Sequence, residues 1–148
     1  MKVNIKNIDT ELQNQNTLNI DTLSTLEMVA LINDEDAQVI QAVKDEVENI
    51  ARATDAVYKT IQNKGRLIYV GAGTSGRIGV LDASEWLPTY GVGEESVVGL
   101  IAGGDKALRH PIESAEDDES AAVHDLGAIH FNENDILCAL ASSGRTPY

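Results

Sequence analysis

A glycine-rich segment with two hydroxyl side chains, Gly71 to Arg77, directly follows a short apolar run. Glycines let the backbone approach an anion, and the free N–H groups at the start of a helix point toward it. Thr74 and Ser75 add hydroxyl donors that suit phosphate oxygens. The segment also matches G-x-G-x-x-G, so three interpretations stay open: a phosphosugar site, a dinucleotide site and a tight turn without a ligand. Its candidate phosphate-binding residues are Gly73, Thr74, Ser75 and Gly76.

A second hydroxyl-rich segment, Ala141 to Pro147, follows another apolar run. Two such loops at neighbouring strand ends can surround one phosphate group, and a dinucleotide fold has no need for the second. The acidic residue that a dinucleotide site requires after its second strand has only a poor candidate in Asp105, behind two glycines. The alternative is an ordinary Ser/Gly turn that a proline ends. We favour phosphate binding by Ser142, Ser143 and Thr146.

Two carboxylates, Glu85 and Glu116, are candidates for acid–base chemistry. Glu85 falls near the end of the helix expected after the first loop, and Glu116 falls in an acidic turn. We expect both to face the carboxyl edge of the sheet, where two carboxylates in different environments can serve as base and acid. The alternatives are a surface position for Glu85 and, for residues 116–119, a solvated helix start.

Three continuous apolar runs must position these groups. They are Leu67–Val70, Val97–Ala102 and Ile136–Ala141, and helical or turn-like segments separate them. Such strands alternating with helices predict a parallel sheet covered on both faces. The fold class is therefore α/β, a three-layer sandwich preceded by N-terminal helices. Because open sheets commonly have about five or six strands, we expect this chain to be a fragment, incomplete at its C-terminus.

The chain divides into a polar arm at residues 1–23, a helical segment at residues 24–64 and the α/β domain at residues 65–148. In the helical segment, Ser24 can cap a first helix together with Glu27. A second helix is expected to begin at Asp34 or Asp36 and to end at about Asn63, because apolar residues recur there at helical spacing. Gly65 is expected to end it in the left-handed conformation.

The composition excludes several partners. The formal net charge is −13, so nucleic acid and anionic membranes are not expected to bind. The single cysteine, Cys138, fits a reducing, cytoplasmic setting, and we see no signal peptide or transmembrane span. The three histidines have no metal-binding spacing with Cys138, so no metal site is expected.

Several segments together resemble one family. The two loops look like the phosphate-binding loops of sugar isomerase domains, which have a flavodoxin-like sheet. Longer stretches of the chain resemble the N-acetylmuramic acid 6-phosphate etherase family. These stretches are residues 16–17, 20–21, 25–27, 66–77, 79–85, 98–104, 115–118 and 143–148.

The resemblance implies cleavage of the D-lactyl ether of N-acetylmuramic acid 6-phosphate, which gives N-acetylglucosamine 6-phosphate and D-lactate during cell-wall amino-sugar recycling. It implies elimination followed by hydration, without metal or organic cofactor, in a homodimer for which residues 36–63 could supply the interface. Glu85 and Glu116 stand where the family has its catalytic acids: Glu85 would protonate the leaving oxygen and activate water, and Glu116 would act at C2. The alternatives are a phosphosugar-binding or regulatory module without chemistry and, less favoured, a dinucleotide-binding domain.

The chain departs from the family's usual pattern at four places. Trp86-Leu87 replaces Cys-Pro, and the bulk of Trp86 is expected to crowd the pocket. Gln13 stands where an arginine is usual, and Ser142 replaces alanine. Pro111 is expected to end the preceding helix early, because proline inside a helix costs about 3 kcal/mol.

Overall fold

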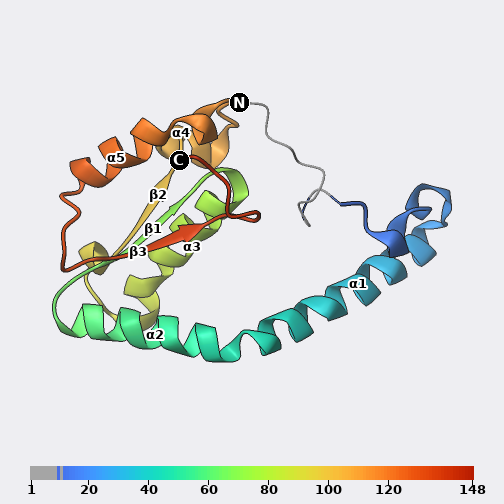
Figure 1. The fold of residues 1–148 in the computed structure, drawn as a ribbon, viewed down its shortest axis with the longest axis horizontal. Coiled ribbons are helices and arrows are strands. Elements are labelled where there is room, and N and C mark those ends of the chain that lie inside the picture. The colour runs from blue at the N-terminus through green and yellow to red at the C-terminus, as the bar shows by residue number, and fades with distance from the viewer. Residues whose placement is uncertain (1–9, 11) are drawn as a thin grey trace. The chain divides into compact units, whose positions relative to one another are not determined.

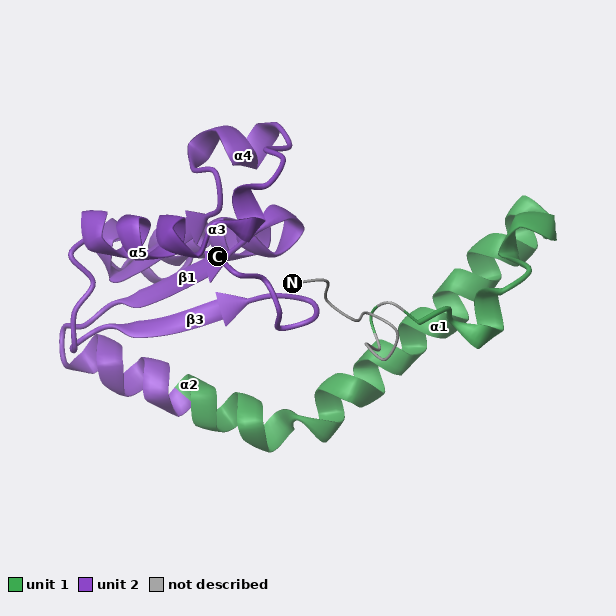
Figure 2. Cartoon of the chain, turned by 45° about the horizontal axis from the view of Figure 1, so that its top comes forward, with its two compact units in different colours: residues 1–54 green, residues 55–148 purple. Residues whose placement is uncertain are grey.

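The computed structural model describes residue 10 and residues 12–148, which fall into two compact units at residues 1–54 and 55–148 (Figure 2). The predicted division into arm, helical segment and domain stays a prediction, and part of the arm lies outside the described residues. No helix of the described residues is both long and apolar enough to cross a membrane.

The first unit holds the short 3-10 turns η2 (Gln15–Thr17) and η3 (Ile20–Thr22), then α1 (Thr25–Asp45) and the first half of α2 (Val47–Gln62). The predicted cap at Ser24 is confirmed: its backbone N–H donates to Glu27 at 2.9 Å, and its hydroxyl accepts from the Glu27 N–H at 3.4 Å. The expected helix start at Asp34 or Asp36 is wrong. Aspartate fits an exposed helix surface without ending the helix, so α1 continues through both, and the break comes at Glu46.

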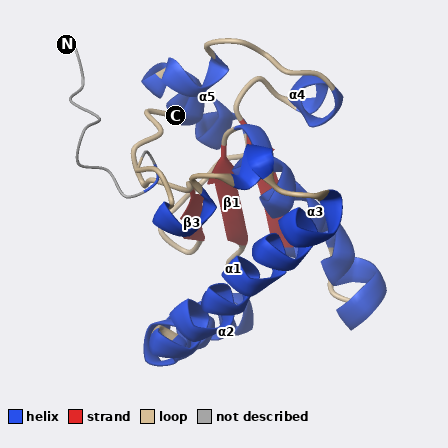
Figure 3. Ribbon diagram, turned by 90° about the vertical axis from the view of Figure 1, so that its right-hand side faces the viewer, coloured by secondary structure: helices blue, strands red, loops and turns tan. Residues whose placement is uncertain are grey.

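The second unit is built on a three-stranded parallel sheet. It contains β1 (Leu67–Gly71), α3 (Gly73–Tyr90), η4 (Glu94–Ser96), β2 (Val97–Ile101), α4 (Asp105–Arg109), η5 (Ala115–Asp117), α5 (Glu119–Ala128) and β3 (Ile136–Leu140). The strand order is β2-β1-β3, with β1 in the middle (Figures 1 and 3). The predicted α/β class is confirmed, and each strand agrees with its predicted apolar run to within one residue.

Helix α3 packs on one face of this sheet. A Cβ atom on Gly99 of β2 would lie 2.7 Å from Cα of Val80, so the strand and helix backbones approach closely. On the opposite face of β1, Ile68 is fully buried and Val70 is 5% exposed, so the middle strand is covered on both sides. That face is more open on β3, where Leu137 is 42% exposed.

The end of α2 differs in detail from the prediction. Lys64, and not Gly65, takes the left-handed conformation, with a φ of 64°. The Lys64 N–H donates to Ile61 O at 3.0 Å and the Gly65 N–H donates to Thr60 O at 2.9 Å, which is the Schellman arrangement. Glycine is required at position 65 for space, because a Cβ atom there would lie 1.8 Å from the carbonyl oxygen of Asn134. At α4 the prediction holds, since the helix ends at Arg109, before Pro111.

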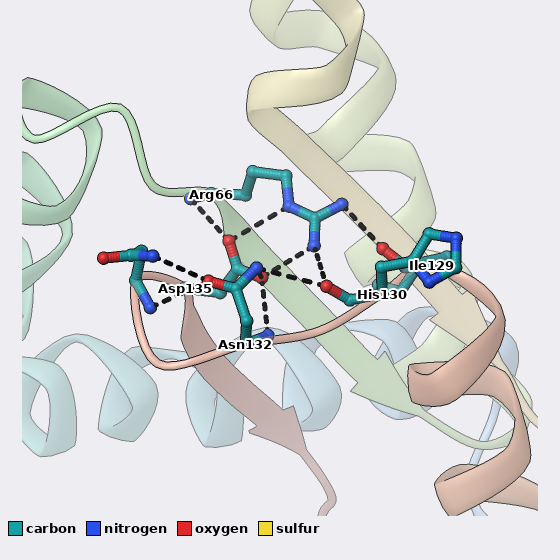
Figure 4. A network of polar contacts seen from close by, with 6 residues as sticks. Arg66, Ile129, His130, Asn132 and Asp135 are labelled. Carbon is teal, nitrogen blue, oxygen red and sulfur yellow. Dashed lines mark hydrogen bonds and ion pairs between the residues drawn. The ribbon is translucent and has the colours of Figure 1, made fainter.

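The amino edge of the sheet is held by the Arg66–Asp135 network (Figure 4), a name used here for these two residues with Ile129, His130 and Asn132. Asp135, whose side chain is 2% exposed, accepts from the Arg66 backbone N–H and from Nε, both at 3.0 Å, and from Nη2 at 2.6 Å. The guanidinium also donates to the carbonyl oxygens of Ile129 and His130 at 3.0 and 3.2 Å. The ion pair therefore joins the starts of β1 and β3, and the bonds to Ile129 and His130 attach the chain that leaves α5.

Candidate functional site

The two predicted loops leave the same edge of the sheet from neighbouring strands. Gly71, the last residue of β1, is the register partner of Leu140, the last residue of β3. Because the strands are parallel, the loops that follow them begin side by side at the carboxyl edge, as expected. Open α/β sheets bind their ligands at this edge.

The first loop turns directly into α3. Gly73 has a φ of 55°, which favours glycine, and it is the first residue of the helix. Thr74 is exposed and Ser75 is half-buried. The N–H groups of the first helical turn therefore lie at the carboxyl edge, where an anion would meet the positive end of the helix dipole.

Gly76 has a packing role in this loop. It is buried, and its N–H donates to Ala72 O at 3.2 Å. A Cβ atom at this position would lie 2.5 Å from the carbonyl oxygen of Gly71, so only glycine allows α3 to start so close to β1.

Replacing Gly76 by Ala is expected to lower the free energy of unfolding by about 2 kcal/mol or more, because backbone atoms cannot yield to the added methyl group. Gly127→Ala is the matched control: it also lies in a helix, but a Cβ atom there meets nothing within 4 Å. Helix propensity predicts that the control gains up to about 1 kcal/mol. Urea denaturation of both variants checks the pair, and equal stabilities would contradict the close approach.

The second loop presents its hydroxyls to solvent. Ser142 and Ser143 are exposed, and Gly144 has a φ of 65°. Thr146 is half-buried and helps to line a cavity of about 150 Å³ that also touches Gly71 at the end of β1. The structure thus brings Thr146 to the end of β1, where the first loop begins, and leaves the two serines exposed to solvent.

A larger cavity of about 360 Å³ lies at the same edge. Its wall includes Gly73 and Arg77 from the start of α3, and Glu113 and Glu116 from the chain that follows α4. Trp86 does not line it, so its expected crowding of the pocket is not found in this cavity. Its indole N–H donates to Asp82 at 3.0 Å and its ring packs edge-on against Tyr90 at 5.4 Å, along its own helix.

Arg77 fixes one wall of the larger cavity. Its Nη2 donates to Ala107 O at 2.7 Å and its Nε donates to Leu108 O at 3.2 Å, so it bonds carbonyl oxygens at the end of α4. Nothing in the sequence indicated this contact, because the direction of a short helix such as α4 is not determined by the residues near Arg77.

Glu116 lies in η5, and it does not cap the helix that follows. Asp118 is the cap of α5: its carboxylate accepts from the backbone N–H groups of Ser120 and Ala121 at 2.9 and 3.2 Å. The hydrogen bond from the Ser120 hydroxyl lowers the pKa of Asp118. The alternative of a solvated helix start therefore applies to Asp118, whereas Glu116 is an exposed carboxylate on the cavity wall.

Glu85 is not at the carboxyl edge, and that expectation is corrected. A helix rises about 1.5 Å per residue, so Glu85 lies about 18 Å along α3 from Gly73. Its neighbours Ser84 and Leu87 line a separate cavity of about 380 Å³ together with Val97, the first residue of β2. Because α3 runs back along the sheet after β1, its second half lies near the amino ends of the strands.

Among the residues that the structure describes, no group of three or more His, Cys, Asp or Glu side chains could hold a metal ion.

Comparison with known proteins identifies the family. The family model of the glucokinase regulatory protein N-terminal SIS domain matches residues 49–148. The chain is 54% identical over all of its 148 residues to a protein of Photorhabdus laumondii named N-acetylmuramic acid 6-phosphate etherase, of which it covers 49%. Proteins of that name from Clostridium beijerinckii and Mycoplasma mycoides are 56% and 49% identical over 99% and 98% of the chain, each covered to 48%.

The chain therefore spans about half the length of the curated relatives that it matches. This similarity covers both loops at the carboxyl edge, the sheet and the helices before it. The chain belongs to the family of glucokinase regulatory protein N-terminal SIS domains, and within it the chain is similar over its whole length to the N-acetylmuramic acid 6-phosphate etherases.

Proposed function

We propose that this chain carries the phosphosugar site of an etherase that converts N-acetylmuramic acid 6-phosphate to N-acetylglucosamine 6-phosphate and D-lactate, a lyase of cytoplasmic amino-sugar recycling. The observation that carries the proposal is the cavity of about 360 Å³ whose lining includes both Gly73, at the start of α3, and Glu116. The names of the relatives point to the same chemistry.

The phosphate group would lie between the two loops at the carboxyl edge. The first turn of α3 offers N–H groups and the Thr74 and Ser75 hydroxyls, and the second loop offers Ser142, Ser143 and Thr146. These donors are neutral, so they bind an anion locally although the protein as a whole carries a net charge of −13.

The proposed reaction begins when the sugar ring opens, because the C2 proton then lies beside an aldehyde and becomes acidic. Glu116 removes this proton as a general base, and the bond between C3 and the lactyl oxygen breaks. Glu85 protonates the leaving oxygen, so D-lactate departs and a double bond joins C2 and C3. Glu85 then takes a proton from a water molecule whose hydroxyl adds at C3, while Glu116 returns a proton to C2, and this gives N-acetylglucosamine 6-phosphate.

The position of Glu85 favours a homodimer in this proposal. A carboxylate about 18 Å along α3 from Gly73 does not reach a sugar whose phosphate lies at that residue. A second copy could bring its own Glu85 to the site. Exposed apolar side chains on α1 and α2 offer an interface: Leu26, Val29, Ile32, Val39, Ile40, Val43, Val47 and Ile50 are all at least 47% exposed.

A second candidate is a phosphosugar-binding module without chemistry. The matching family model favours it, because it is named after a regulatory protein. A dinucleotide site is less favoured, since Asp105 is the first residue of α4 and lies beyond the end of β2.

Titration calorimetry tests the ligand class. N-acetylglucosamine 6-phosphate is expected to bind, whereas N-acetylglucosamine and NAD are not, because the loops recognise a phosphomonoester. Ser143→Ala is expected to weaken binding about tenfold, the cost of one hydrogen bond to a charged group. Thr89→Ala, which removes an exposed hydroxyl near the far end of α3, is the control and should bind as the wild type does. Binding of NAD in place of the sugar phosphate would overturn the proposal.

A further inference from the structure

Tyr148 links the second loop to the turn that carries Glu116. It lies two residues after Thr146, and its backbone N–H donates to the carbonyl oxygen of Glu116 at 3.1 Å. Its hydroxyl donates to Asp125 Oδ2 on α5 at 2.7 Å. One residue therefore contacts the Glu116 turn through its backbone and the following helix through its side chain.

The Glu116 turn, a name used for residues 114–117, is short and contains a residue with a strained backbone. Its helix η5 is three residues long and begins after Ser114, which has a φ of 60° that costs energy in a residue other than glycine. Within the turn, the Asp117 N–H donates to Ser114 O at 3.2 Å. The hydrogen bond from Tyr148 is a contact between this turn and the sheet edge, and it fixes the carbonyl of the very residue that faces the cavity.

The hydroxyl of Tyr148 is bound firmly enough to fix the ring. It is partly buried, and burial together with the hydrogen bond to Asp125 raises its pKa, so it stays a neutral donor over the physiological pH range. The other oxygen of Asp125 lies 3.3 Å from Nδ1 of His124, which is exposed. The Asp125 carboxylate thus accepts from Tyr148 while its second oxygen faces a solvated group.

We propose that Tyr148 is a positioning residue that couples the loop Ser142–Thr146 to the Glu116 turn, so that a sugar whose phosphate is held by the loop meets the Glu116 carboxylate at a fixed place. This coupling rests on the proposed phosphosugar function. A shift of about 1 Å in a reacting group can lower the rate about 100-fold, so one hydrogen bond that holds the Glu116 turn in place can affect catalysis.

Two NMR measurements on the 148-residue chain test the coupling, and the first needs no ligand. Amide hydrogen exchange at Asp117 and at residue 148 is expected to become about tenfold faster in Tyr148→Phe, which keeps the ring and loses the bond to Asp125. Asp125→Ala is expected to have the same effect, and the double variant no larger one, because both changes remove one bond. Tyr90→Phe, which alters an exposed tyrosine on α3, is the matched control.

The second measurement is a titration with N-acetylglucosamine 6-phosphate. In the wild type, the amide signals of residues 142–146 and of residues 115–117 are expected to shift together. In Tyr148→Phe the loop signals should still shift, with a Kd within about twofold of the wild type, while the shift at residues 115–117 is lost. A merely structural role of Tyr148 would weaken binding at the loop as well.

The outcomes separate the coupling from the proposed function. Unchanged exchange in Tyr148→Phe, or shifts at residues 115–117 that persist in this variant, would overturn the coupling. If the wild type does not bind the sugar phosphate, the proposed ligand is wrong and the coupling to a phosphosugar falls with it. The exchange experiment then still decides whether Tyr148 holds the Glu116 turn.

Discussion

Replacing Glu116 by Gln is expected to lower the rate of D-lactate release from N-acetylmuramic acid 6-phosphate about 10³-fold, within the range for losing a general base. Glutamine has nearly the same shape and cannot take the C2 proton. The measurement is an enzymatic assay of D-lactate. Glu113→Gln is the matched control, because Glu113 lines the same cavity and has no assigned role; it should retain activity within about threefold.

The roles of Glu116 and Glu85 can be distinguished in deuterated water, where exchange of the C2 proton is measured beside D-lactate release. Glu116→Gln should lose both D-lactate release and exchange of the C2 proton, because neither can begin without the base. Glu85→Gln should still exchange the C2 proton while lactate release falls by a similar factor. The reverse pattern would interchange the two roles, and full activity in either variant would remove that residue from the mechanism.

Mixing the two inactive variants tests whether Glu85 comes from a second copy. If each site combines Glu116 of one copy with Glu85 of the other, mixed dimers contain one intact site, and a random mixture recovers about a quarter of the wild-type activity. If both carboxylates belong to one copy, the mixture stays inactive.

The second large effect concerns stability. Asp135→Ala is expected to lower the free energy of unfolding by about 2–3 kcal/mol, because the half-buried Arg66 guanidinium loses its charge partner and the hydrogen bonds to it. It also removes the acceptor for the Asn132 N–H. Glu133→Ala, an exposed carboxylate two residues away, is the control and should change stability by less than about 0.5 kcal/mol. Equal values for the two variants would show that the network contributes little.

The same network predicts how stability depends on pH. The hydrogen bond from Arg66 holds the pKa of Asp135 below its ordinary value of 3.8. A carboxyl group whose pKa is lower in the folded state stabilises the protein above its unfolded pKa, and this contribution is lost as the pH falls through the folded pKa. The free energy of unfolding should therefore drop on acidification below about pH 4. Asp135→Asn should reduce that drop, as urea denaturation at a series of pH values would show.

The sequence predicted those features whose causes are local. Three apolar runs bounded by polar or glycine residues sufficed for the strands, because such runs are typical of parallel strands buried on both sides. Ser24 and Glu27 form the expected cap, since both partners lie within one helical turn. The same local logic failed at Asp34 and Asp36, where nothing beyond composition suggested a break, and at the end of α2, where Lys64 takes the left-handed conformation and Gly65 is required only for space beside Asn134.

The candidate site was harder to predict because its contacts join distant residues. Arg66 and Asp135 are 69 residues apart, and no periodicity relates them. The link from Tyr148 to Glu116 depends on how a loop after β3 meets a turn after α4. The position of Glu85 was misjudged for a simpler reason: α3 continues to Tyr90, so a residue near its end is carried away from the edge where the helix begins.

Incubation of the purified 148-residue chain with N-acetylmuramic acid 6-phosphate, followed by an assay for D-lactate, tests the central claim most directly. We expect D-lactate to be released in equal amount to N-acetylglucosamine 6-phosphate, and this release to disappear in Glu116→Gln. Binding of the sugar phosphate by the folded chain without any release of D-lactate would contradict catalysis by this chain and would leave a phosphosugar-binding module.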